Sequence, residues 1–327
     1  MLELKSARVL VTGARGFVGS HLVERLAAEG CRVRCFDRAS AGEGLLRHLP
    51  DTARRGLEVV VGDLRDEAAV RRAAQGMDVI CHLGALTSVP YALEHPREVM
   101  ETNLMGTVNV LVAARDLGVG RVVVVSSGDV YGTARYLPLD EGHPLQSRSP
   151  YAASKIGAEK AAESFHAAYG LPVVILRPFN AYGPRQSARA VIPSIIAQAL
   201  AGPTVRLGAT WPTRDFTYVA DTVEALLLAA RCEAAPGRIF NIGSGTEIAI
   251  GDLARMIITL LGRDVTIISE EAERLRPAAS EAQRVRADNT LARQVLGWKP
   301  RVPLEEGLRR TIDWIAAHLE DYRQSES

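Results

Sequence analysis

The sequence has few cysteine residues and no grouping of the side chains that bind metal ions. Its four cysteines are Cys31, Cys35, Cys81 and Cys232, and neither a Cys-x-x-Cys pair nor a cluster of histidines accompanies them. A metal site is therefore not expected. Cys31, Cys35 and Cys81 fall in or beside segments with the pattern of buried strands, which favours small core residues in a reducing compartment.

A large net charge and a long apolar run are also missing. The chain has 39 Lys and Arg against 38 Asp and Glu, so its formal net charge is +1. No strong field therefore attracts it to nucleic acid or to a membrane surface. No segment approaches the roughly 20 apolar residues of a membrane span, and the first residues lack the apolar run of a signal peptide. We expect a cytoplasmic protein with no nucleic-acid or membrane partner.

What the sequence does contain is an alternation of short apolar runs with helical patterns. The runs are continuous, as in parallel strands that are buried on both faces. A helix at Ser20–Ala28 follows the first of them. Strand and helix in alternation predict an α/β Rossmann fold with a doubly wound parallel sheet. The predicted strands are Arg8–Thr12, Arg32–Phe36, Glu58–Val61, Asp78–His82, Arg121–Ser126, Leu171–Leu176 and Ile239–Ile242.

The pattern loosens after about Phe179, where most of the remaining prolines and arginines occur. We interpret residues 1–178 plus 221–246 as a Rossmann domain that binds a dinucleotide. Residues 179–220 plus 247–327 are then a smaller mixed α/β lobe that folds over the open edge of the sheet and binds the substrate.

A glycine-rich turn connects the first strand to the first helix. Gly13 permits a tight turn, Gly16 lets the backbone approach a pyrophosphate, and Gly19 lets helix and strand pack closely. The N-terminus of the helix that follows presents free N–H groups to the phosphates. Asp37 ends the second strand, where a carboxylate accepts both adenosine ribose hydroxyls and repels a 2′-phosphate. The cofactor is therefore predicted to be NAD rather than NADP, although Arg38 lies beside Asp37.

Two further features belong to this site. Asp63 follows the third strand and could bond the adenine amino group. Leu83, Gly84 and Ala85 end the fourth strand, where small residues allow close approach to the cofactor.

The strongest signal is Tyr151-Ala-Ala-Ser-Lys155, preceded by Ser126 and Ser127 at the end of the fifth strand. A tyrosine and a lysine four residues apart lie on one face of a helix. The lysine ammonium, together with a cationic nicotinamide ring, stabilises phenolate and lowers the tyrosine pKa from about 10. A phenolate can take the hydroxyl proton of an alcohol while hydride leaves its carbon, and Ser127 would share the hydrogen bond.

With these motifs the sequence resembles the extended short-chain dehydrogenases that act on nucleotide sugars, namely 4-epimerases, 4,6-dehydratases and decarboxylases. The resemblance covers essentially the whole chain. It implies a homodimer formed through two amphipathic helices, Val99–Leu117 and Tyr151–Tyr169. Further matching motifs are Thr102–Thr107, Val130–Gly132, Arg177–Arg185, Thr213–Val219 and Asn241–Ser244.

The resemblance also implies which residues contact cofactor and substrate. Phe17, Val18, Arg38, Leu64, Asn103 and Pro178 join the cofactor site. A nucleotide sugar brings about two negative charges, and planar guanidinium groups suit its diphosphate. The substrate candidates are Ser88, Asn180, Arg185, Val191, Arg214 and Arg276, with Arg189 as likely to be a solvated surface residue as a ligand. The base is left open among UDP, GDP and dTDP.

The reaction depends on the residues after Ser127. Members of the family first oxidise the sugar at C4, and dehydratases then need a carboxylate to remove the C5 proton. Asp129 stands where the resemblance places a glutamate, whereas Gly128 cannot supply the proton that an aspartate there gives the departing C6 hydroxyl. We therefore expect an NAD-dependent 4,6-dehydratase.

Several alternatives stay open at this point. The segments Ser88–Pro90 and His95-Pro96 resemble the corresponding segments of 4-epimerases that act on N-acetylhexosamines. A UDP-glucose or UDP-N-acetylglucosamine 4-epimerase is therefore the main alternative. A decarboxylase or reductase is a weaker one, as is a non-catalytic dinucleotide sensor, which would have no reason to keep Ser127, Tyr151 and Lys155.

Overall fold

A computed structural model describes residues 4–270 and 283–323. Its centre is a seven-stranded parallel sheet with the order β11-β6-β5-β4-β1-β2-β3. This is the doubly wound arrangement expected from the sequence. The strands are β1 (Arg8–Thr12), β2 (Arg32–Asp37), β3 (Glu58–Val61), β4 (Val79–His82), β5 (Arg121–Val125), β6 (Val173–Pro178) and β11 (Ile239–Ile242).

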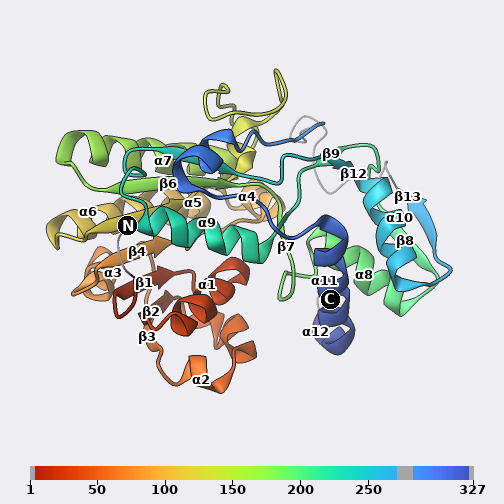
Figure 1. Cartoon of the computed structure of the whole chain (residues 1–327), viewed down its shortest axis with the longest axis horizontal. Coiled ribbons are helices and arrows are strands. Elements are labelled where there is room, and N and C mark those ends of the chain that lie inside the picture. Colours follow the sequence, from red (N-terminus) through yellow and green to blue (C-terminus); the bar gives the residue numbers. More distant parts are fainter. Residues whose placement is uncertain (1–3, 271–282, 324–327) are drawn as a thin grey trace.

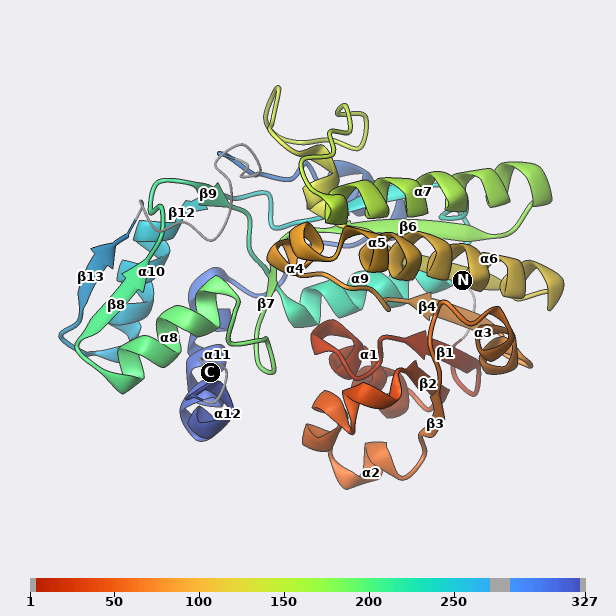
Figure 2. The same ribbon diagram turned by 180° about the vertical axis from the view of Figure 1, so that it is seen from behind.

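Helices cover both faces of the sheet (Figures 1 and 2). Helices α1 (Phe17–Ala28) and α9 (Val219–Arg231) pack on the face to which Val9 and Val11 point. Helices α3 (Glu67–Ala74), α6 (Gly106–Asp116) and α7 (Pro150–Tyr169) pack on the opposite face, which Leu10 joins. Successive strand residues thus enter two different apolar cores, which explains why the strand sequences are apolar without alternation.

Strand β3 departs from this expectation. Val59 and Val61 are 48% and 53% exposed, although the apolar run Glu58–Val61 predicts a strand that is buried on both faces. The reason is that β3 lies at the edge of the sheet and pairs with β2 alone. A run of valines reports strand propensity, and neighbouring strands and helices decide burial. The short helix α2 (Asp51–Arg54) lies in the connection that precedes β3.

The second lobe has its own apolar core and lies to one side of the Rossmann domain (Figures 1 and 2). It mixes helices with short strand pairs, in which β8 pairs with β13, β7 with β10 and β9 with β12. Its helices are α8 (Val191–Ala201), α10 (Ile250–Leu261), α11 (Leu304–Ala317) and α12 (Leu319–Arg323), and its strands are β7 (Ala181–Tyr182), β8 (Thr204–Leu207), β9 (Thr213–Arg214), β10 (Thr217–Tyr218), β12 (Ile248–Ala249) and β13 (Thr266–Ser269).

One segment that the sequence assigned to this lobe packs elsewhere. Ala292, Leu296 and Trp298 are buried in the core between the sheet, α1 and α9, and the Trp298 indole N–H donates to the Asp221 carbonyl at 2.8 Å. The chain therefore returns to the Rossmann domain before α11. Within the described residues no helix is long and apolar enough to cross a membrane.

Candidate active site

The loops that follow the parallel strands meet at one edge of the sheet. Gly13 follows β1 and Gly84 lies beyond β4, the two neighbouring strands at which the strand order reverses. A Cβ on Gly13, whose φ is 70°, would lie 2.8 Å from the Gly84 Cα, and a Cβ on Gly19 would lie 2.1 Å from the Gly13 carbonyl oxygen. Only glycine fits these positions. In open α/β sheets, this crevice is where nucleotides bind.

Asp37 stands at the end of β2, beside this turn. Its carboxylate accepts a hydrogen bond from the Arg15 backbone N–H at 3.2 Å. Burial raises the pKa of Asp37 to about 6, while the Arg15 N–H and the Arg15 charge act in the opposite direction. The carboxylate is therefore ionised at neutral pH and can accept the hydroxyls of a ribose.

The structure gives Asp63 a partner that the sequence-based interpretation did not include. Arg65, two residues further on, donates to the Asp63 carboxylate from its backbone at 2.9 Å and from its guanidinium at 3.0 and 2.7 Å. These bonds lower the pKa of Asp63. The carboxylate expected to bond an adenine amino group is thus also the acceptor of an ion pair. Leu64, the next residue, is buried.

A chain of hydrogen bonds runs behind the cofactor-facing loops. The Gly84 N–H donates to the Thr12 hydroxyl at 3.0 Å, which lies 2.7 Å from His82 Nδ1. On the other side, His82 Nε2 lies 3.0 Å from the Thr107 hydroxyl, which donates to the Asn103 carbonyl at 2.5 Å. Burial lowers the pKa of His82 to about 3. In this neutral ring the proton lies on Nε2, because each threonine then donates once and accepts once.

Asn103 lies in a π-helical segment, Glu101–Met105, between α5 (Pro96–Met100) and α6. Its amide donates to the Leu86 carbonyl and to the Ser154 hydroxyl, both at 2.9 Å, and its oxygen accepts the Leu86 N–H at 2.7 Å. The Ser154 hydroxyl in turn donates to the Tyr151 carbonyl at 2.7 Å. Asn103 therefore ties the loop after β4 to the helix that carries Tyr151. π-bulges often occur at functional sites.

Helix α7 presents Tyr151 and Lys155 to the same site. Ser149 caps this helix by accepting the Ala152 N–H at 3.1 Å, and Pro150 occupies its first turn, where a missing N–H costs nothing. The Lys155 ammonium donates to the Val125 carbonyl at 2.8 Å, and burial lowers its pKa to about 8. Lys155 therefore stays predominantly charged at neutral pH.

Tyr151 is buried and its hydroxyl is hydrogen-bonded to that of Ser127. The protein by itself raises the pKa of Tyr151, first by burial and then through the charge of Asp129, whereas Ser127 acts to lower it. The pKa reduction expected from the sequence therefore needs positive charge at the site in addition to that of Lys155. An oxidised nicotinamide ring is such a charge.

The geometry fits a bound NAD in two respects. The backbone turn at Gly13 and Gly19 leaves no room for side chains, as a phosphate cradle requires. The hydroxyl of Ser126, at the end of β5, is buried without a hydrogen-bond partner among the residues the structure describes. Such a group is ordinarily satisfied, so a polar ligand is its natural partner. Phe17, Val18, Leu83, Ala85 and Pro178 flank the same edge of the sheet.

Asp129 belongs to a 3₁₀ turn, Gly128–Tyr131, directly after Ser127. The Ser127 hydroxyl accepts the Asp129 N–H at 3.1 Å. Asp129 is exposed, and its charge acts on Tyr151. Gly128 packs against Phe179, since a Cβ there would lie 3.3 Å from the ring. The site therefore has one carboxylate next to the serine and tyrosine hydroxyls and no side chain at the position between.

Two of the substrate candidates, Arg214 and Asn180, lie at one cleft, and the others lie elsewhere in the chain. Arg214 lines a cleft together with Phe216, Ser244 and Arg301. The exposed Asn180 donates to the Asp215 carbonyl at 3.0 Å and so lies beside this cleft. Arg301 was not singled out from the sequence, because an exposed arginine between prolines carries no motif. Ser88 caps α4 (Val89–Glu94), Val191 begins α8, Arg189 is exposed, and Arg276 lies outside the described residues.

Arg185 differs from expectation. Its guanidinium donates to the Glu24 carboxylate of α1 at 2.6 Å and lies over the ring of Trp314 in α11. It is buried, with the left-handed φ of 68°. Arg185 thus joins α1 to the second lobe through one nitrogen, while its Nε and Nη1 have no hydrogen-bond partner among the described residues. A lone arginine in a motif cannot reveal this, because Glu24 is 161 residues away in the sequence.

Asp215 is a residue that the sequence-based interpretation missed. Its fully buried carboxylate accepts the backbone N–H groups of Ser244, Gly245 and Ala287 at 2.7, 2.9 and 3.0 Å, and the Ser244 hydroxyl at 2.7 Å. These bonds fasten the loop after β11 to the wall of the Arg214 cleft. The position of Asp215 directly after Arg214 was the available signal.

Known proteins are similar to this chain over nearly its whole length. The family model of GDP-mannose 4,6-dehydratase matches residues 10–311. UDP-glucose 4-epimerase from Mycolicibacterium smegmatis is 37% identical over 314 residues, which cover 94% of this chain and 98% of that protein. An epimerase structure from Methanothermobacter thermautotrophicus is similar with a TM-score of 0.91 at 30% identity, over 98% of this chain and 96% of that one. The structure of dTDP-glucose 4,6-dehydratase from Streptomyces venezuelae, solved with NAD, is similar with a TM-score of 0.85 at 33% identity. The match covers 95% of this chain and 97% of that one.

Proposed function

The chain belongs to the NAD-dependent dehydratases and epimerases of nucleotide sugars, a branch of the extended short-chain dehydrogenases, and on this premise we propose that it is a nucleotide-sugar 4,6-dehydratase. The observation that carries the proposal is the position of Asp129. Its carboxylate follows Ser127 in a 3₁₀ turn and is close enough to Tyr151 to raise the pKa of the phenol. A base at this position suits removal of a proton from the carbon next to C4.

Bound NAD supplies the hydride acceptor and donor for such a reaction. Tyr151 takes the proton of the 4-hydroxyl, with Ser127 sharing the hydrogen bond, and the Lys155 charge favours the phenolate. The C4 ketone makes the C5 proton acidic, and Asp129 removes it. The C6 hydroxyl then leaves as water, and return of the hydride to C6 together with protonation at C5 completes the reaction. Gly128 has no side chain that could donate a proton to the departing C6 hydroxyl. That proton therefore comes from the Asp129 carboxyl or from solvent.

The nucleotide sugar is proposed to lie between this catalytic group and the second lobe. Arg214 faces a cleft in which a guanidinium can bond two diphosphate oxygens at once. Asn180 is exposed beside it. Ser88, at the start of α4, and Val191, at the start of α8, are proposed to contact the sugar and the nucleoside.

A second candidate, a nucleotide-sugar 4-epimerase, is favoured by Gly128. Epimerisation needs no proton donor for a departing C6 hydroxyl, and the M. smegmatis relative carries the name of a UDP-glucose 4-epimerase. In that reaction the 4-keto sugar would rotate within the site and take hydride back on its other face. Asp129 would then have no chemical step to perform.

Incubation with UDP-, GDP- and dTDP-hexoses in deuterated water separates the two reactions. A dehydratase gives a product that is lighter by one water and carries solvent deuterium at C5. An epimerase gives a product of unchanged mass without that deuterium. A product free of deuterium at C5 contradicts the dehydratase proposal, whatever the fate of the sugar configuration.

We further propose that the active form is a homodimer. Helices α6 and α7 lie side by side (Figures 1 and 2), and Met105, directly before α6, and Tyr169, the last residue of α7, are 51% and 57% exposed. Pairing of such helices across a two-fold axis would bury these side chains. Light scattering coupled to gel filtration measures the assembly, and a monomer at micromolar concentration would contradict this proposal.

A further inference from the structure

The adenosine end of the cofactor site contains three arginines, a group of charges that would suit the 2′-phosphate of NADP. Arg15 lies in the glycine-rich turn, Arg38 directly follows Asp37, and Arg65 directly follows Leu64. An Arg near the end of β2 is the feature that accommodates a 2′-phosphate in doubly wound domains. The arrangement of these cations therefore needs an explanation in a protein whose Asp37 favours NAD.

Each of the three cations has a carboxylate nearby. Arg15 lies next to Asp37, whose pKa its charge affects. Arg65 forms a two-point ion pair with Asp63, at 3.0 and 2.7 Å. The carboxylate beside Arg38 comes from a distant part of the chain.

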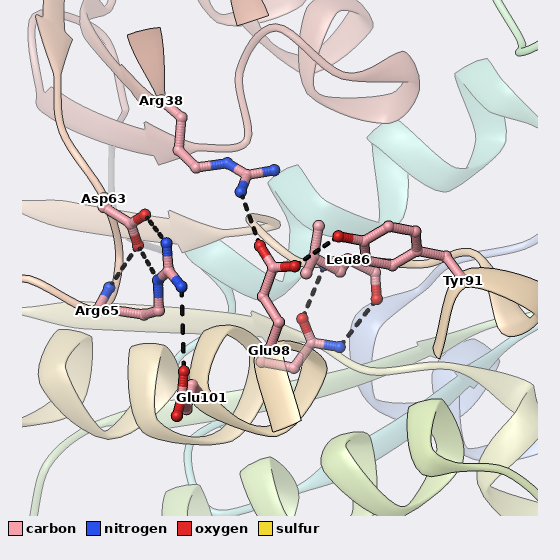
Figure 3. A network of polar contacts seen from close by, with 8 residues as sticks. Arg38, Asp63, Arg65, Leu86, Tyr91, Glu98 and Glu101 are labelled. Atoms are coloured by element: carbon pink, nitrogen blue, oxygen red, sulfur yellow. Dashed lines mark hydrogen bonds and ion pairs between the residues drawn. The ribbon is translucent and has the colours of Figure 1, made fainter. Parts of the chain in front are cut away.

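Arg38 is paired with Glu98 of helix α5, 60 residues away, with 3.4 Å between guanidinium nitrogen and carboxylate oxygen (Figure 3). The other oxygen of Glu98 accepts the Tyr91 hydroxyl at 2.5 Å. The Tyr91 ring is tilted against His95, with 4.3 Å between centroids. Glu98 is thus held from α4 by a phenol and directed at Arg38.

We propose that Glu98 is a specificity-determining residue for the cofactor, which keeps Arg38 neutralised and so prevents it from binding a 2′-phosphate. Asp37 repels the phosphate directly, and Glu98 removes the attraction that the neighbouring cation would otherwise offer. Such selection works by withholding a favourable contact from the wrong ligand. The inference rests on the cofactor site proposed above, and it is independent of whether the reaction is dehydration or epimerisation.

The test measures binding of two fragments, 5′-AMP and adenosine 2′,5′-bisphosphate, by calorimetric titration. They differ by the 2′-phosphate alone and need neither turnover nor sugar. Glu98→Gln keeps the size and can still accept the Tyr91 hydroxyl, but it loses its charge. We expect it to bind the bisphosphate about three- to tenfold more tightly than the wild type, with AMP binding unchanged, as suits a partly exposed ion pair.

Two matched variants assign the gain to Arg38. Glu101→Gln removes a carboxylate of the same region that lies 4.0 Å from Arg65, and it should change bisphosphate affinity less than twofold. Arg38→Ala combined with Glu98→Gln should abolish the gain. An equal gain in Glu101→Gln, or a gain that persists without Arg38, would overturn the proposal in favour of a general effect of net charge.

A variant that retains the charge covers the case in which Glu98→Gln is poorly folded, as judged by thermal melting. Tyr91→Phe removes only the hydrogen bond that holds Glu98, and we expect an affinity for the bisphosphate between those of the wild type and Glu98→Gln. Wild-type affinity in both folded variants contradicts the role of Glu98. Failure of the wild type to bind AMP or NAD at all would instead contradict the cofactor site itself.

Discussion

Glu159 and Arg177 form a two-point ion pair in the interior, with 2.8 and 2.6 Å between nitrogen and oxygen and side chains 0% and 2% exposed. Glu159 follows Lys155 by one turn of α7, and Arg177 lies on β6. Arg177 also donates to the Tyr131 hydroxyl at 2.8 Å, which donates to Asn241 at 2.6 Å. Since Tyr131 ends the turn that carries Asp129, this network connects the catalytic helix to the catalytic turn.

Glu159→Gln should cost about 3–5 kcal/mol of unfolding free energy, because it leaves the Arg177 charge buried without a counter-charge. Glu163→Gln on the same helix is the matched control. Its partner Lys160 is exposed, so its loss should cost about 1 kcal/mol or less. Urea denaturation measures both. Similar losses in the two variants would mean that the interior pair contributes no more than a surface pair.

Tyr151→Phe should reduce turnover by about 10²–10⁴-fold, as expected for loss of a general acid–base group, while NAD still binds. Lys155→Ala should act in the same way. Lys160→Ala, at an exposed position of the same helix, is the control and should keep full activity. Steady-state rates and NAD titration give the two quantities. A fully active Tyr151→Phe enzyme would remove Tyr151 from the mechanism.

Asp129→Asn should stop the reaction after oxidation at C4 if the enzyme is a dehydratase. Bound NADH then accumulates and is visible by its absorbance, and exchange of the C5 hydrogen with deuterated solvent is lost. The substitution also removes the negative charge that raises the pKa of Tyr151, so the oxidation step should move to lower pH. Deuterium at C5 together with an undiminished mutant would keep the reaction and assign the base elsewhere.

Asp37 gives cofactor binding a pH dependence. Because burial raises its pKa to about 6, the carboxylate gains a proton as the pH falls through 6 and ceases to accept two ribose hydroxyls. NAD affinity should therefore fall by up to about tenfold for each pH unit below 6. The unfolded chain, with an ordinary aspartate pKa, ionises at lower pH, so the ionised Asp37 destabilises the folded apo-protein above pH 6, and this penalty is relieved as the pH falls from 6 to about 4.

Asp37→Asn provides the control for this dependence. It should bind NAD more weakly at neutral pH and lose most of the variation between pH 5 and 7. Calorimetric titration of NAD at several pH values compares the two proteins. A wild-type affinity that stays constant down to pH 5 would mean that Asp37 does not contact the ribose in its ionised form.

The sequence predicted the sheet and the shared helix of Tyr151 and Lys155 because both depend on local patterns. Parallel strands buried on two faces are continuous apolar runs, as Arg8–Thr12 shows, and the sheet follows from their alternation with helices. Tyr151 and Lys155 lie four apart on one helix, so their shared face follows from helical geometry alone. The glycine turn likewise combines conformational freedom with a fixed place between strand and helix.

What the sequence did not predict depends on partners that are distant in the chain. The contacts of Arg185 with Glu24 and Trp314 are an example, because both partners are far from it in the sequence. The burial of Ala292 and Trp298 against the Rossmann core likewise follows from tertiary packing. Asp63 differs, because its partner Arg65 is only two residues away. In that case the spacing of Asp63 and Arg65 in the sequence already indicates the ion pair.

The hydrogen-bond chain through His82 has a single polarity. Every proton from the Gly84 amide to the Asn103 carbonyl points the same way, so His82 cannot accept or release a proton without breaking a bond at one of its ends. Burial lowers the pKa of the ring to about 3, so it stays neutral and keeps this one orientation near neutral pH. The loop after β4 and the segment that carries Asn103 are therefore held together by a connection that does not change with pH in that range.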